Sequence, residues 1–122
     1  MTSEELKNRT KKHALAIIKL ANDLPNNRVG WTFTDQIVRS STSVAANYRA
    51  ACRAKSDKDF ISKMETVIEE ADETLFWLEM IDESDILIDK QPIKPLAKET
   101  NELLSIFVAS VKTVKNRLNA AK

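Results

Sequence analysis

Residues able to perform chemistry are few in this chain of 122 residues. It contains one histidine, His13, and one cysteine, Cys52, and no nucleophile or base is paired with either by position in the sequence. We expect His13, in a lysine-rich stretch, to be exposed or half-buried rather than a general base. Cys52 is typical of a small packing residue rather than a nucleophile or metal ligand. Because the chain also has only one Gly and therefore no Gly-rich phosphate loop, we predict that it is not an enzyme.

Carboxylates are concentrated between residues 57 and 91, where twelve Asp or Glu accompany three Lys or Arg. Metal-binding helical bundles use inward-facing Glu residues and Glu-x-x-His pairs, and this sequence contains no such pair. Glu69 and Asp72 fall on the side of their predicted helix that faces away from its apolar stripe. The sequence therefore predicts neither a metal site nor a cofactor.

Four hydroxyl residues follow one another at positions 40 to 43. Ser and Thr compete for backbone hydrogen bonds and usually occupy caps or turns, so a run inside a helix must face groups that accept small polar side chains. At 100° per residue, the run divides among three faces. Ser41 lies near the apolar stripe, Thr42 lies beside a line of Arg39, Arg49 and Arg53, and Ser43 lies on a polar line with Gln36 and Asn47, which Ser40 and Arg39 flank.

The polar line of Gln36, Ser43 and Asn47 has three interpretations that the sequence leaves open. It is a hydrogen-bonded contact between subunits, a ligand-binding surface, or a solvent-exposed face. Polar groups at spacings of seven and four residues are common packing devices. We therefore expect Ser43 to be a packing hydroxyl rather than a nucleophile.

Apolar residues that recur every three or four positions predict four amphipathic helices. Thr2 and Ser3 form a capping pattern before the first, Thr34 and Ser56 are good N-caps for the second and third, and Pro92 precedes the fourth. The predicted helices cover residues 3–24, 35–53, 57–83 and 93–118, and the stretch PNNRVGWTF, residues 25–33, is predicted to be a loop.

Four such helices with short connections pack most simply as an antiparallel up-down-up-down four-helix bundle. We therefore predict an all-α fold with a single domain over residues 1–122. Cys52 has no second cysteine for an internal disulfide, and no apolar run has the length of a signal peptide or membrane span. These features predict a cytoplasmic protein without a membrane partner.

Charge is unevenly distributed, with a net +6 over residues 1–56, −9 over 57–91 and +4 over 92–122. In the predicted bundle, the start of the first helix and the ends of the second and fourth share one end, which gathers Lys and Arg. Helix-end preferences and solubility explain part of this pattern, but bases at the start of the first helix oppose its dipole. A basic end attracts phosphates or an acidic protein partner. The candidate nucleic-acid-binding residues are Lys7, Arg9, Lys11, Lys12, Arg39, Arg49, Arg53, Lys55, Lys112, Lys115 and Arg117.

Phe76, Trp77 and Met80 lie roughly opposite the apolar stripe of the third predicted helix. A monomeric bundle offers large apolar side chains no place there, and such patches usually mark protein contacts. We predict that these three residues form a homo-oligomer interface, the alternative being that the connections fold over them. Trp31 and Phe33 are either part of such a cover or part of the same interface.

The spacing of Gln36, Arg39, Ser43 and Asn47, in T-D-Q-x-x-R-x-x-x-S-x-x-x-N, resembles a known bacterial family. With Leu24-Pro25 before it and a Ser-Asp-capped helix with Phe60 after it, the chain is similar over positions 14 to 118 to the four-helix bundle proteins encoded by intervening sequences of 23S rRNA genes. The resemblance implies a homopentameric ring and no catalytic activity. A relative, the accessory protein of diversity-generating retroelements, binds nucleic acid and a reverse transcriptase.

The chain departs from the family pattern after Asn47. Many members continue with Ile-Ala-Glu-Gly, whereas this chain continues with Tyr48 and has Ala50 in place of the Glu. Any polar network that the Glu builds in relatives must therefore differ here. Two function classes follow: an accessory module that binds RNA or DNA through the basic end, or a structural adaptor that binds another protein.

Overall fold

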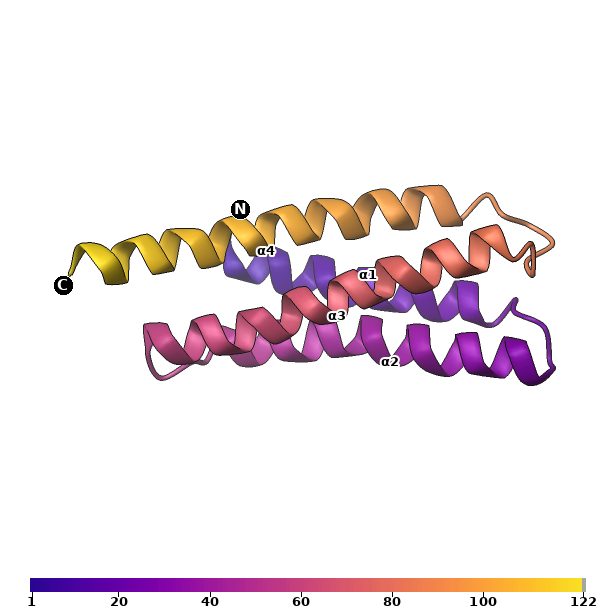
Figure 1. Cartoon of the computed structure of the whole chain (residues 1–122), viewed down its shortest axis with the longest axis horizontal. Coiled ribbons are helices and arrows are strands. Elements are labelled where there is room, and N and C mark those ends of the chain that lie inside the picture. The colour runs from indigo at the N-terminus through magenta and orange to yellow at the C-terminus, as the bar shows by residue number, and fades with distance from the viewer. Residues whose placement is uncertain (122) are drawn as a thin grey trace.

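The computed structural model describes residues 1–121 as four antiparallel α-helices, which confirms the all-α bundle (Figure 1). Each helix packs on its two neighbours, and α1 packs closely on α2 but only sparsely on α4. The pairs α1 with α3 and α2 with α4 lie on the diagonals. The four helices are α1 (Ser3–Ala21), α2 (Arg28–Ala51), α3 (Asp57–Glu83) and α4 (Ile93–Ala120).

Side-chain caps define where three of these helices begin. The hydroxyl of Thr2 accepts a hydrogen bond from the amide of Glu5 at the start of α1, and Ser56 accepts one from Asp59 at the start of α3. Each bond satisfies one of the amides that the first turn of a helix leaves unpaired. The predicted start and end of α3 are therefore confirmed.

The predicted loop over residues 25–33 is wrong beyond its third residue. α2 begins at Arg28, where the side chain of Asn27 accepts a hydrogen bond from the amide of Gly30 at 2.9 Å. Gly30 itself packs against the backbone of Pro25, so the single glycine allows close contact rather than a flexible turn. Thr34, the predicted cap, is an ordinary residue of the second turn. Phe33 consequently joins the core instead of a loop.

The core consists of two apolar clusters, one toward each end of the bundle. Leu6, Val44, Met64 and Phe107 belong to the cluster at the end where α1 begins. Ile17, Ile37, Leu78 and Ile93 belong to the other. Between these two clusters in each helix lie buried polar residues, which we call the polar waist: Thr10 and His13 of α1, Ser40 and Ser41 of α2, Thr74 of α3, and Thr100 of α4.

Candidate functional site

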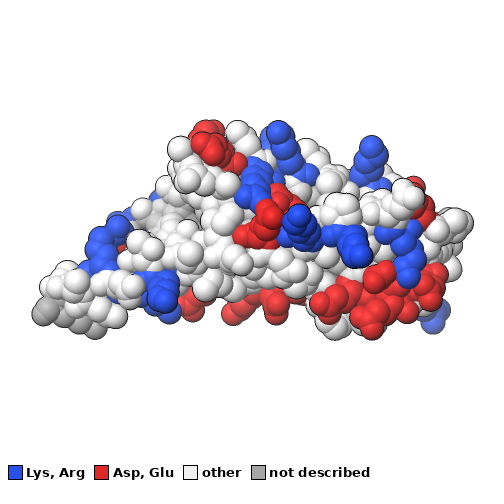
Figure 2. All heavy atoms as spheres, turned by 90° about the horizontal axis from the view of Figure 1, so that it is seen from above, with Lys and Arg blue, Asp and Glu red and all other residues white. Residues whose placement is uncertain are grey.

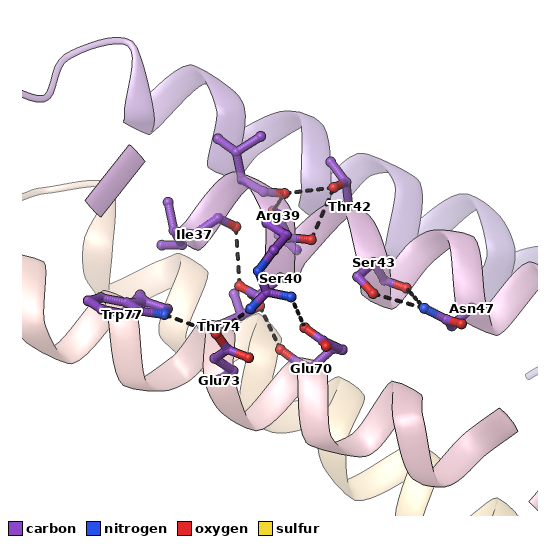
Figure 3. Close-up of polar contacts among 12 residues, drawn as sticks. Ile37, Arg39, Ser40, Thr42, Ser43, Asn47, Glu70, Glu73, Thr74 and Trp77 are labelled. Carbon is purple, nitrogen blue, oxygen red and sulfur yellow. Dashed lines mark hydrogen bonds and ion pairs between the residues drawn. The ribbon is translucent and has the colours of Figure 1, made fainter. Parts of the chain in front are cut away.

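The polar waist explains the run of hydroxyl residues in α2. Ser40 and Ser41 are fully buried, and the hydroxyl of Thr74 on α3 donates a hydrogen bond to Ser40 at 2.9 Å. Ser43 is half-buried and accepts a hydrogen bond from the side chain of Asn47 at 2.8 Å. Because Asn47 also bonds to the Ser43 carbonyl, this contact stays within α2 (Figure 3). The inter-helix hydroxyl contact of the run therefore belongs to Ser40, not to Ser43.

The predicted exposure of His13 is wrong. Its side chain is only 4% exposed, and its Nε2 atom lies 2.7 Å from the hydroxyl of Thr100 on α4. A sequence signal for this position existed, since His13 follows Thr10 by three residues and precedes Ile17 by four, the spacing of a core-facing stripe. The stripe was missed because its members at positions 10 and 13 are polar.

The arginine of the family motif links α2 to α3. Arg39 donates hydrogen bonds to Glu70 at 3.0 Å and to Glu73, and it keeps the pKa of the Glu73 carboxyl below its ordinary value, chiefly through that second hydrogen bond (Figure 3). The indole N–H of Trp77 also approaches Glu73, at 3.4 Å. Arg39 is therefore paired with carboxylates of α3, whereas Arg49 and Arg53 form no ion pair within residues 1–121.

Several of the predicted phosphate-binding residues form ion pairs with Asp or Glu residues of the same chain. Arg9 binds Glu99 through two hydrogen bonds of 2.6 and 2.7 Å and also contacts Glu102. Arg117 binds Asp57 at 2.9 Å, and Lys7 and Lys115 make longer contacts with Glu4 and Glu65. Within residues 1–121, the candidates that form no ion pair are Lys11, Lys12, Arg49, Arg53, Lys55 and Lys112.

A groove of about 560 Å³ between α1 and α2 brings part of this set together. Its basic residues come in pairs four residues apart, one pair on each helix, so that both walls carry positive charge. Leu15, which is 56% exposed, and Ile18 contribute apolar surface. The basic residues are Lys7, Lys11, Arg49 and Arg53, one acid, Glu4, lies beside them, and Ala14, Thr42, Ala45 and Ala46 are among the other lining residues.

Positive and negative charge lie on opposite sides of the bundle. α1 contains five Lys or Arg and two Glu, whereas α3, its diagonal partner, contains two Lys and ten Asp or Glu. In Figure 2, the largest acidic area runs along the lower edge, and most basic atoms lie above it together with smaller acidic groups. The groove between α1 and α2 therefore faces a potential that favours anions.

The predicted oligomer residues form a surface patch of two exposed side chains and one anchored ring. Phe76 and Met80 are 49% and 38% exposed, one helical turn apart on α3. Trp77 is half-buried, with its ring 5.7 Å from that of Phe33 and 5.0 Å from that of Phe76. Phe33 is thus part of the support under the patch, whereas Trp31 is exposed and bonds to Asn26.

Residues 1–121 contain no group of three or more His, Cys, Asp or Glu side chains arranged to hold a metal ion. None of the helices in this part of the chain is both long and apolar enough to cross a membrane. The half-buried Cys52 is a free thiol.

Tyr48, where the chain departs from the family motif, is buried in the core. Its ring stacks on that of Phe107, with ring centres 5.7 Å apart, so an aromatic core contact follows the polar line of Gln36, Ser43 and Asn47 along α2.

Sequence and structure comparisons identify the relatives of this bundle. The family model described as 23S rRNA-intervening sequence protein matches residues 4–109. The chain belongs to this family. A crystal structure of a protein of unknown function from the S23 ribosomal protein family of Bacteroides thetaiotaomicron is similar, with 30% sequence identity and a TM-score of 0.80 over 88% of this chain and 98% of that one. No curated protein matches the chain.

Membership in the 23S rRNA-intervening sequence protein family confirms the resemblance drawn from Gln36, Arg39, Ser43 and Asn47. Three of these residues make contacts that give the motif a structural role: Arg39 links α2 to α3, and Asn47 bonds back to Ser43. Gln36 is half-buried on the same side of α2. The contacts of the motif thus lie within α2 or between α2 and α3, and none of its four residues lines the groove between α1 and α2.

Proposed function

We propose that this protein is a non-enzymatic, cytoplasmic accessory module that assembles as a homo-oligomer and binds nucleic acid through the groove between α1 and α2. The observation that carries the proposal is the gathering of Lys11, Arg49 and Arg53, which form no ion pair within residues 1–121, around this one groove. Free Lys and Arg side chains bind phosphates, whereas paired ones must first give up their carboxylates. One chain has a net charge of only +1, but each subunit of an oligomer would add one positively charged groove. A nucleic acid that contacts several grooves at once would bind more tightly than to one.

A salt titration with labelled RNA and DNA oligonucleotides tests this proposal. If three phosphates are contacted, affinity should fall about 40-fold for a DNA duplex and about 20-fold for a single strand between about 50 and 200 mM salt. The triple variant Lys11→Glu, Arg49→Glu, Arg53→Glu should lose binding. Its matched control, Lys19→Glu, Lys94→Glu, Lys98→Glu, makes the same change in net charge with exposed residues outside the groove and should retain most of the affinity. Equal losses in both variants, or no salt-dependent binding at micromolar protein, would contradict the proposal.

The proposed oligomer uses the patch of Phe76, Trp77 and Met80. Its support is the exposure of Phe76 and Met80 on a helix whose other apolar side chains are mostly covered. Because Phe76 and Met80 are 49% and 38% exposed, burying the rest of these two side chains in a contact is worth about 1 to 3 kcal/mol. The family resemblance adds the expectation of a pentamer.

Light scattering of charge-introducing variants tests the oligomer. Phe76→Glu with Met80→Glu should lower the measured mass, because two carboxylates would enter the contact without partners. Ile88→Glu with Val108→Glu alters two exposed apolar residues elsewhere and should leave the mass unchanged. An unchanged mass in the first variant would show that the patch is not the interface.

The apolar surface of the groove supports a second candidate function, that of an adaptor for another protein. Leu15 and Ile18 line the same groove as the basic residues, a combination that also fits an acidic amphipathic helix. Copurification separates the candidates. A stoichiometric protein that survives nuclease treatment and is lost in the Lys11, Arg49, Arg53 variant would favour the adaptor.

A further inference from the structure

The hydrogen bonds around His13 fix the position of its proton. The hydroxyl of Thr100 donates its single hydrogen to the carbonyl of Leu96 at 2.7 Å. The same hydroxyl lies 2.7 Å from the Nε2 atom of His13, and which of the two donates there depends on the tautomer of the ring. We assign the neutral tautomer with its hydrogen on Nε2, because the other tautomer would leave a buried N–H on Nδ1 without an acceptor.

The Nδ1 atom of His13 is buried and has no hydrogen-bond partner within the described chain. A lone pair without a donor is tolerated more readily than an N–H group and a positive charge without an acceptor. Protonation of the ring would create that second, worse situation. Burial accordingly lowers the pKa of His13 below its ordinary value, against a smaller opposing effect of Glu99.

The neighbouring groups offer the protonated ring no free counter-charge. On α4, the acidic residue that acts on His13 is Glu99, and both of its carboxylate oxygens already bind Arg9 of α1. At the same level, α2 and α3 contribute the buried hydroxyls of the polar waist, Ser40, Ser41 and Thr74. Within residues 1–121, the carboxylate that acts on His13 is therefore already paired with Arg9.

His13 lies in the contact between α1 and α4, which is the least extensive of the four helix–helix contacts. Two polar links cross this contact: Arg9 with Glu99 and Glu102, and His13 with Thr100. α1 is also the helix that contributes Lys7 and Lys11 to the groove. A change at His13 thus acts on a weakly packed helix that forms one wall of the groove.

We propose that His13 makes the contact between α1 and α4 pH-sensitive, so that acid releases α1 and alters the basic groove. The second half of this statement rests on the proposed function, whereas the release of α1 does not. Release of α1 from α4 exposes the His13 ring to water, where it titrates near its ordinary pKa of 6.5. The exposed ring can then be protonated, whereas burial in the closed bundle disfavours protonation.

The direction and window of the effect follow from linkage. The closed form of His13 has the lower pKa, so its contribution to stability is fully present above pH 6.5 and is lost as the pH falls from there toward the lower pKa of the closed form. The ratio of open to closed α1 should rise up to about tenfold per pH unit within this window. Because His13 is the only histidine and ordinary carboxyl groups titrate near 4, the range from about pH 6.5 to 5 reports chiefly on this residue.

Amide hydrogen exchange of the full chain without nucleic acid tests the proposal, after correction for the pH dependence of intrinsic exchange. Between about pH 7 and 5, the amides of α1 should lose protection more steeply than those of α2 and α3. The variant His13→Gln, which keeps a donor for Thr100 but cannot titrate, should show a flat profile. Thr100→Val should lower protection at every pH yet keep the slope, because its histidine still titrates.

Three outcomes would overturn the inference. These are equal slopes in the native chain and His13→Gln, equal loss of protection in all four helices, and an NMR titration in which the His13 ring of the native chain has an ordinary pKa. The NMR titration needs no variant, so it decides the question even where a substitution prevents folding. Since none of these measurements contains nucleic acid, they fail or succeed independently of the binding assay for the groove.

Discussion

At the scale of single residues, Gly30 has a role that its surroundings determine. A Cβ atom at this position would lie 1.8 Å from the carbonyl oxygen of Pro25, far inside contact distance. In an open helix, Gly→Ala stabilises by about 1 kcal/mol because alanine has the higher helix propensity. Here the clash should reverse the sign, and we expect Gly30→Ala to destabilise the fold by about 3 kcal/mol, measured by urea denaturation.

The neighbouring Val29 provides the control for that prediction. Its side chain is 51% exposed, so Val29→Ala tests the same turn of α2 without the contact to Pro25. We expect a change within about 0.5 kcal/mol for this variant. A Gly30→Ala protein as stable as the native one would show that the turn before α2 shifts to accommodate a methyl group.

Single residues also show where sequence patterns stop being informative. Buried apolar residues such as Ile37, Leu78 and Phe107 fall on the predicted stripes, because hydrophobic periodicity reports burial directly. His13 and Ser40 are just as buried, but their burial depends on partners from other helices, Thr100 and Thr74. A pattern read along one helix contains no information about such partners.

At the scale of helices, the start of α2 shows which of two candidate residues, Asn27 or Thr34, caps the helix. Asn27 makes the capping hydrogen bond, and Thr34, which the sequence favours, lies inside the helix. Asn27→Ala should cost about 1 kcal/mol and increase amide exchange over residues 28–33. Thr34→Ala should cost less and leave exchange there unchanged. The opposite ranking would mean that α2 begins near Thr34 in solution.

The helices themselves were predictable wherever a cap and a stripe agree. α3 has both, in Ser56 and the stripe through Met64, Val67, Ala71, Leu78 and Ile81, and its predicted limits match the structure. The start of α2 was predicted too late because its first turn contains Gly30, and glycine is common in turns and loops. What decides its conformation is the contact of Gly30 with Pro25, which no local propensity describes.

At the scale of the whole molecule, the position of the groove depends on topology. Lys11 and Arg53 are 42 positions apart in the sequence and line the same groove because α1 and α2 are antiparallel neighbours. The up-down order of the helices predicted this meeting at one end. It could not predict that Arg9, Arg39 and Arg117 bind carboxylates of the same chain, since such pairing depends on the rotation of each helix about its axis.

The polar waist divides the core into two clusters, and the pair formed by Thr74 and Ser40 is its link between α2 and α3. Thr74→Val alone should destabilise the bundle by about 1 to 3 kcal/mol, because it leaves the buried Ser40 without this donor. Adding Ser40→Ala should restore much of the loss, since replacing both partners by apolar groups is nearly neutral. A double-mutant cycle in urea should therefore give a coupling energy of about 1 kcal/mol, and additive losses would show that the two hydroxyls act independently across the bundle.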